Sequence, residues 1–153
     1  MALLRGYLQK SVATERLFNR LIALWASAKL PSLLTAAERQ AIIDSALSLQ
    51  QQDGGWATAA LGTWKRVDGT ALDTASDGHA TGLVALALEQ AGAPRSNPHL
   101  SKALGWLSRH QDPATGGWVA SSLNKKRDPA SDAGKFMSDA ATAYAVLALA
   151  GAR

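Results

Sequence analysis

Apolar positions along this 153-residue chain recur with the period of an α-helix, and no stretch alternates as a strand would. The first pattern covers residues 13–29 and stops before Pro31. It consists of Leu17, Phe18, Leu21, Leu24, Trp25 and Ala28. Four further helices are predicted over residues 36–51, 77–91, 98–111 and 139–150. The pattern therefore predicts an all-helical protein.

Capping residues support these bounds. Thr35 and Glu38 have the spacing of a capping box at the start of the second helix. Asn97 followed by Pro98 predicts an N-cap and a first-turn proline for the fourth helix. Ser76 and Ser138 are assigned as the N-caps of the third and fifth helices, and Gly92 and Gly151 as the glycines that end them.

The helices alternate between two kinds of surface. The helices predicted at 36–51 and 98–111 have one apolar and one polar face, which is typical of a helix at the protein surface. Those at 77–91 and 139–150 are apolar almost all round, so we expect them to be buried on every side. This alternation predicts an all-α fold, a partial α/α toroid of outer and inner helices.

Two connections are unusually long, at residues 57–75 and 119–137, and connections of this length are often functional. Each runs from an outer to an inner helix, so we expect both at the same end of the bundle. Both carry basic clusters, which suit a diphosphate or an acidic sugar, although charge on a solvated loop needs no special cause. The ligand-binding candidates are Trp64, Lys65, Arg66, Lys126 and Arg127.

One sequence unit of about 60 residues is used twice. In each copy a leucine and a glutamine four residues later precede a Gly-Gly-Trp turn. The two copies are Leu47, Gln51 and Trp56, and Leu107, Gln111 and Trp118. We therefore predict a single domain over 1–153, with a lead-in helix in 1–34 and repeats at 35–94 and 95–153.

These segments resemble the QW motifs of squalene-hopene cyclases and related prenyltransferase-like proteins. The second copy is fuller, because Lys102-Ala103 supplies the start of the motif where the first copy has Ile42-Ile43. The resemblance covers residues 35–150 and implies a structural role for Gln51, Trp56, Gln111 and Trp118, with the glutamines tying helix ends and the tryptophans packing beside them. It also implies a hydrophobic isoprenoid as ligand.

The catalytic acid of those cyclases, in a DxDD motif, has no counterpart here. Asp77 and Asp139 are the nearest weak candidates, but each also fits a first-turn carboxylate favoured by the helix dipole. His79 is a third weak candidate, because a His-Asp pair can transfer protons. Aromatic residues make up only 6% of the chain, few for a carbocation cavity. We therefore expect no independent cyclase activity.

Composition narrows the remaining functions. The chain has no cysteine, which excludes the zinc site of protein prenyltransferases, and no metal or cofactor is predicted. Its net charge of +4 is modest, and no predicted helix carries a basic stripe for nucleic acid. No apolar run is long enough to span a bilayer. No signal peptide is recognised, so the default expectation is the cytoplasm or the membrane periphery.

The predicted helices are fewer than a closed toroid of this family contains. We therefore expect either a missing N-terminal half or self-association, since an open end would expose apolar helix faces. Two other functions stay open. One is a non-catalytic helical scaffold for a protein or polymer, and the other is a polysaccharide lyase on a similar toroid, with Lys65 or Arg66 as the base.

Overall fold

The computed structural model describes residues 2–151, and all regular structure in that range is helical, which confirms the all-α fold class there. The α-helices are α1 (Ala2–Ser11), α2 (Leu17–Ser27), α3 (Ala36–Leu47), α4 (Gly78–Gln90), α5 (Pro98–Arg109) and α6 (Asp132–Ala150). Two short 3-10 helices are η1 (Val12–Thr14) and η2 (Thr58–Leu61). Met1, Ala152 and Arg153, which the predicted domain limits include, lie outside the described residues.

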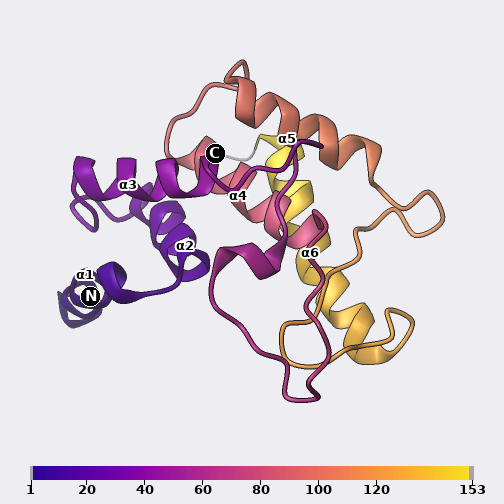
Figure 1. Ribbon diagram of the computed structural model, residues 1–153. Coiled ribbons are helices and arrows are strands. Elements are labelled where there is room, and N and C mark those ends of the chain that lie inside the picture. Colours follow the sequence, from indigo (N-terminus) through magenta and orange to yellow (C-terminus); the bar gives the residue numbers. More distant parts are fainter. Residues whose placement is uncertain (1, 152–153) are drawn as a thin grey trace.

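The α-helices after α1 form two rows. In the inner row α4 contacts both α2 and α6, and in the outer row α3 contacts α2 while α5 contacts α4 and α6. Figure 1 shows α4 crossing the middle of the molecule, with α1 and α6 on opposite sides of it. The rows agree with the predicted alternation of outer and inner helices, while the toroid itself stays a prediction.

Helix α4 is buried on every side, as its apolar sequence predicted. Every residue from Gly78 to Leu88 except His79 is buried. Neighbours on three sides, α2, α5 and α6, account for this burial. The core of the protein is therefore centred on this helix.

Helix α6 differs from its prediction in two ways. It begins at Ser131, whose hydroxyl accepts the backbone N–H of Gly134 at 3.2 Å, and not at Ser138, which lies inside the helix. The expectation of burial on every side is wrong, because one face of α6 stays open. The side chains of Phe136 and Val146 are 77% and 49% exposed. An apolar sequence alone could not indicate that α4 and α5 leave one face of α6 uncovered.

The N-terminal region contains one more helix than the sequence predicted. The pattern at 13–29 corresponds to α2 preceded by η1, and α1 lies before it. Predicted caps were confirmed at Thr35, which forms a full capping box, and at Asn97. At α4 the N-cap is Asp77 rather than the neighbouring Ser76.

Matching hydrogen bonds define the two repeats. The indole N–H of Trp56 donates to the carbonyl of Ala46 at 2.7 Å, and that of Trp118 donates to Leu107 at 3.0 Å. The backbone N–H groups of the same tryptophans donate to the hydroxyls of Thr81 and Thr142, at 3.0 and 3.1 Å. Each tryptophan therefore ties the end of an outer helix to the following inner helix.

The glutamine that bonds the Gly-Gly turn of the first repeat lies one residue before the position that the sequence motif assigns to it. The amide of Gln111 donates to the carbonyl of Gly116 at 2.7 Å, and the equivalent bond to Gly54, at 2.9 Å, comes from Gln50. Gln51 instead donates to the carbonyl of Thr74 at 2.7 Å. In the hydrogen-bond pattern Gln50, rather than Gln51, is thus the counterpart of Gln111.

Close contact between α4 and α6 depends on glycine. A methyl group at Gly82 would lie 2.7 Å from the backbone nitrogen of Ala145 and 2.9 Å from the carbonyl carbon of Tyr144. At Gly78 it would collide with Trp118. Backbone atoms cannot yield as the end of a flexible side chain can, so Gly82 sets the separation of the two helices.

We therefore predict that Gly82→Ala lowers the free energy of unfolding by about 1–3 kcal/mol, the usual cost of overpacking a core. Urea unfolding followed by circular dichroism measures it. Gly6→Ala is the matched control, since Gly6 is also helical and has nothing within 4 Å of the added carbon. The control should be neutral or stabilising by up to about 1 kcal/mol. A Gly82→Ala protein as stable as wild type would contradict the close contact between α4 and α6.

Candidate ligand pocket

The two long connections are joined through Arg66, whose side chain is 2% exposed. Its Nε donates to the carbonyl of Ser122 at 2.9 Å, and its terminal nitrogens bond the carbonyl of Ala71 and the carboxylate of Asp73. All three guanidinium nitrogens therefore have partners within the protein. Arg66, a candidate for ligand binding in the sequence, holds the loops together instead.

Further bonds between the loops surround Arg66. The backbone N–H of Val67 donates to the carbonyl of Asn124 at 2.8 Å, and that of Lys126 donates to the carboxylate of Asp68 at 2.7 Å. The hydroxyl of Thr70, followed by backbone N–H groups, holds the pKa of Asp68 below its ordinary value. The loops thus form one ordered rim.

Asp77 anchors the start of α4. One carboxylate oxygen accepts the N–H of Ala80 at 2.9 Å and the hydroxyl of Thr58 at 2.7 Å, and the other accepts the N–H of Thr58 at 2.7 Å. These bonds satisfy the helix terminus and attach η2 to it. The carboxylate is buried and fully engaged, which agrees with the helix-terminus interpretation.

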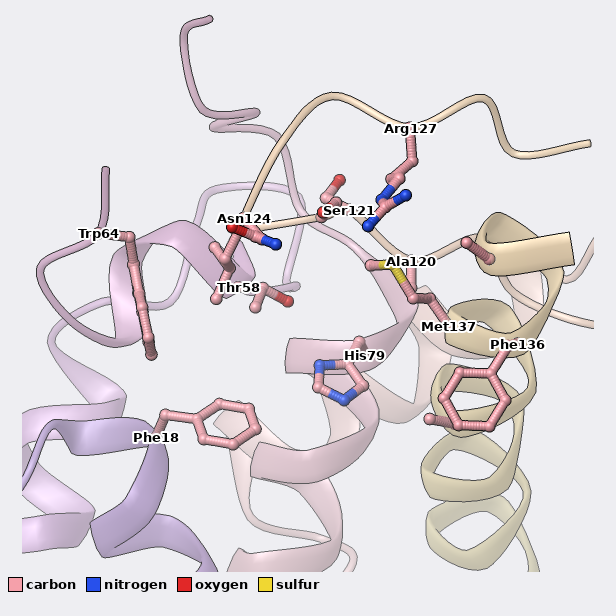
Figure 2. Close-up of a pocket in the computed structure, with 14 residues that line it drawn as sticks. Phe18, Thr58, Trp64, His79, Ala120, Ser121, Asn124, Arg127, Phe136 and Met137 are labelled. Carbon is pink, nitrogen blue, oxygen red and sulfur yellow. The ribbon is translucent and has the colours of Figure 1, made fainter. Parts of the chain in front are cut away.

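A pocket of about 420 Å³ lies between the loop rim and the N-terminal ends of α4 and α6. Figure 2 shows His79 on its floor, Phe18 and Trp64 on one side, Phe136 and Met137 on the other, and Arg127 above. Its lining is mainly apolar, and the polar side chains stand singly around it. The remaining lining residues are Thr58, Ala120, Ser121, Ser122, Leu123, Asn124, Ala133 and Ala140.

His79 is packed among aromatic rings. It stacks on Phe18 with the ring centroids 5.6 Å apart and meets Tyr144 edge to face at 5.3 Å. Burial lowers the pKa of His79 below 6.5, and the nearby carboxylate of Asp77 opposes that shift. The imidazole is therefore neutral at neutral pH and can donate or accept one hydrogen bond in the pocket.

Trp64 closes one side of the pocket. The guanidinium carbon of Arg16 lies 4.4 Å from the centre of the indole, and Phe18 meets the indole edge to face at 6.4 Å. Among the described residues nothing accepts a hydrogen bond from its buried Nε1–H. This nitrogen is buried, so the pocket meets the face of the indole ring and not this donor.

The other candidates from the sequence fall into two groups. Arg127 lines the pocket, as does His79. Lys65, Lys126 and Asp139 are exposed and do not line it. The structure thus brings His79, Trp64 and Arg127 together and separates them from the remaining cations.

Sequence reasoning missed the apolar half of the pocket. Phe18 comes from α2, which precedes both repeats, and Phe136 and Met137 were assigned to a loop because the start of α6 was placed too late. The available signal was Ser131 followed by Asp132, a serine N-cap before a first-turn carboxylate.

No group of three or more metal-binding side chains gathers anywhere in residues 2–151. Over the same range, no helix has both the length and the apolar character needed to cross a membrane. No family model, no curated protein and no solved structure matches the chain. The resemblance to squalene-hopene cyclases therefore rests on the two sequence motifs.

The burial of His79 predicts a loss of stability in acid. Because the unfolded chain has the higher histidine pKa, it takes up the proton first, and folding weakens as the pH falls through 6.5 toward the folded pKa. Above 6.5 both states are neutral and the effect vanishes. Urea unfolding of wild type and His79→Gln between about pH 8 and pH 5 measures it. The variant should lose less stability, while carboxylates and other histidines affect both proteins alike. Equal losses in the two proteins would contradict a partly buried imidazole that stays neutral in the folded state.

Proposed function

We propose that this chain binds a small, mainly apolar ligand with one anionic or oxygen-rich end, and that the ligand class is isoprenoid. The observation that carries the proposal is the pocket of about 420 Å³, which has aromatic walls and a single arginine above it. Its size lies within the range of about 300–1,000 Å³ found for small-molecule sites. The isoprenoid class rests on the motif resemblance.

The apolar part of the ligand would lie against Phe18, Phe136 and Met137. Aromatic rings offer large contact areas, and the thioether of methionine adapts to irregular shapes. The side chain of Phe136 is 77% exposed. Leaving so large an apolar surface in contact with water costs free energy unless something covers it. A ligand in the pocket would cover part of that ring.

The polar end of the ligand would lie toward the loop rim. Arg127 supplies a guanidinium for bidentate contact with a carboxylate or phosphate. The polar side chains of Ser121 and Asn124 line the pocket on the same side. These groups favour a ligand with a charged head over a plain hydrocarbon.

The same geometry favours binding over catalysis. Asp77 already accepts three hydrogen bonds and is 7% exposed, so it is a poor acid for an alkene. A lyase would need a free base, but Lys65 lies outside the pocket and Arg66 is engaged by the loops. Neither alternative enzyme is therefore favoured.

Binding is tested by calorimetric titration with farnesyl diphosphate and farnesol. Ala140→Phe should weaken binding of both, because it fills the pocket, and Ala37→Phe on the exposed side of α3 is the control. Arg127→Gln should weaken the diphosphate by about tenfold or more and leave the alcohol nearly unchanged, since a charge-assisted bond contributes about 1.5–3 kcal/mol. Wild-type affinity in Ala140→Phe, or no binding of either ligand, would refute the proposal.

A separate assay addresses catalysis. Because no free carboxylic acid lines the pocket, incubation of the purified chain with squalene should yield no hopene by mass spectrometry. A cyclase assayed in parallel verifies that the substrate is presented in usable form. Hopene formed by this chain, and abolished in Asp77→Asn, would overturn the binding-only assignment.

A further inference from the structure

Helix α6 has an open face on the side away from α4. Its exposed positions are spaced by three and four residues, so they form one stripe along the helix. The stripe combines apolar and acidic side chains, in the order Asp132, Phe136, Asp139, Ala143, Val146 and Ala150, and the exposed Lys135 and Ala140 flank it. The opposite side, with Ala141, Ala145 and Ala148, is buried.

This open face cannot receive another helix as α4 receives α6. The two threonines that bind the motif tryptophans, Thr81 and Thr142, set the repeat at 142 − 81 = 61 residues. In that register Asp139 and Ala143 stand where α4 has Gly78 and Gly82. Even the methyl group of an alanine excludes the close backbone contact that glycine allows, so a partner must pack on α6 at greater distance, through side chains.

A second open face lies on α1. Leu3, Leu4 and Tyr7 are 91%, 52% and 65% exposed. Lys10 follows Tyr7 by three residues and therefore lies on the same side of the helix. The helix is attached to the rest of the protein by the amide of Gln9, which donates to the carbonyl of Ser32 at 2.7 Å.

The two faces are complementary. The stripe on α6 carries two aspartates with Lys135 at its edge, a net charge of −1, and the open face of α1 carries Lys10. Pairing α6 with α6 would bring together two faces of net negative charge, and pairing α1 with α1 would bring together two lysines, so both are less favourable than pairing α1 with α6. Figure 1 places α1 and α6 on opposite sides of the molecule, so α1 can meet the α6 face only between copies.

We propose that this chain associates head to tail with a second copy of itself, the open face of α1 in one copy packing on the open face of α6 in the next. Such an interface joins two different surfaces, and it closes into a ring or extends into a chain according to its rotation. It would cover the largest exposed apolar side chains of both helices. Phe136 belongs both to the stripe and to the pocket lining, but Leu4 and Val146 lie outside the pocket, so substitutions there test association without altering the pocket.

Light scattering over about a hundredfold range of concentration tests the proposal through mass action. The wild-type mass should rise to at least twice that of the monomer. Leu4→Glu and Val146→Glu should each remain monomeric, while Val67→Glu, at another exposed valine, should behave as wild type. Circular dichroism verifies folding, which exposed positions tolerate well.

Mixing the two monomeric variants is the deciding measurement. The Leu4→Glu copy keeps an intact α6, and the Val146→Glu copy keeps an intact α1, so the equimolar mixture should form a 1:1 dimer. A wild type that stays monomeric throughout would overturn the proposal. The proposal would also be overturned if Val146→Glu were monomeric while Leu4→Glu associated as fully as wild type, because that result requires α6 to pair with α6.

Discussion

The close contact of α4 with α6 is the constraint on which the rest of this structure depends. Glycine at position 82 lets the α4 backbone approach that of α6 at a distance no other residue permits. Since both helices begin at the same end of the inner row, the loops that precede them meet there. Arg66 and Asp68 then bond the first loop to the second. The pocket exists because two helix starts and two loops are held in this one arrangement.

The polar groups at this end mostly order the protein and leave few for a ligand. Asp77 caps α4, and Arg66 directs its donors to the loops. Buried charges need such partners, because an unpaired ion in a protein interior costs several kcal/mol. The ionisable side chains that line the pocket are a neutral histidine and one arginine. A site of this kind selects by shape and by a single charged contact, with little capacity for proton transfer to a hydrocarbon.

Local signals predicted local structure well. The capping box at Thr35 and the Asn97-Pro98 start were correct because each depends on residues at most three apart. The predicted start of α6 was wrong because Ser131 and Ser138 are both suitable N-caps. Only the packing of the preceding loop against Gly134 decides between them. The role of Arg66 could not be foreseen for the same reason. Its partners come from segments up to 56 residues away, which no local pattern encodes.

The two repeats share a hydrogen-bond framework and differ in the surfaces it supports. Tryptophan and threonine make the same bonds in each copy, which fixes how an outer helix joins an inner one. In α4 Gly78 accepts the side chain of Trp118 and Gly82 accepts a helix, whereas in α6 an aspartate and an alanine stand at the matching sites. The shared bonds thus account for how the helices join, and the difference between the two inner helices determines which faces stay open.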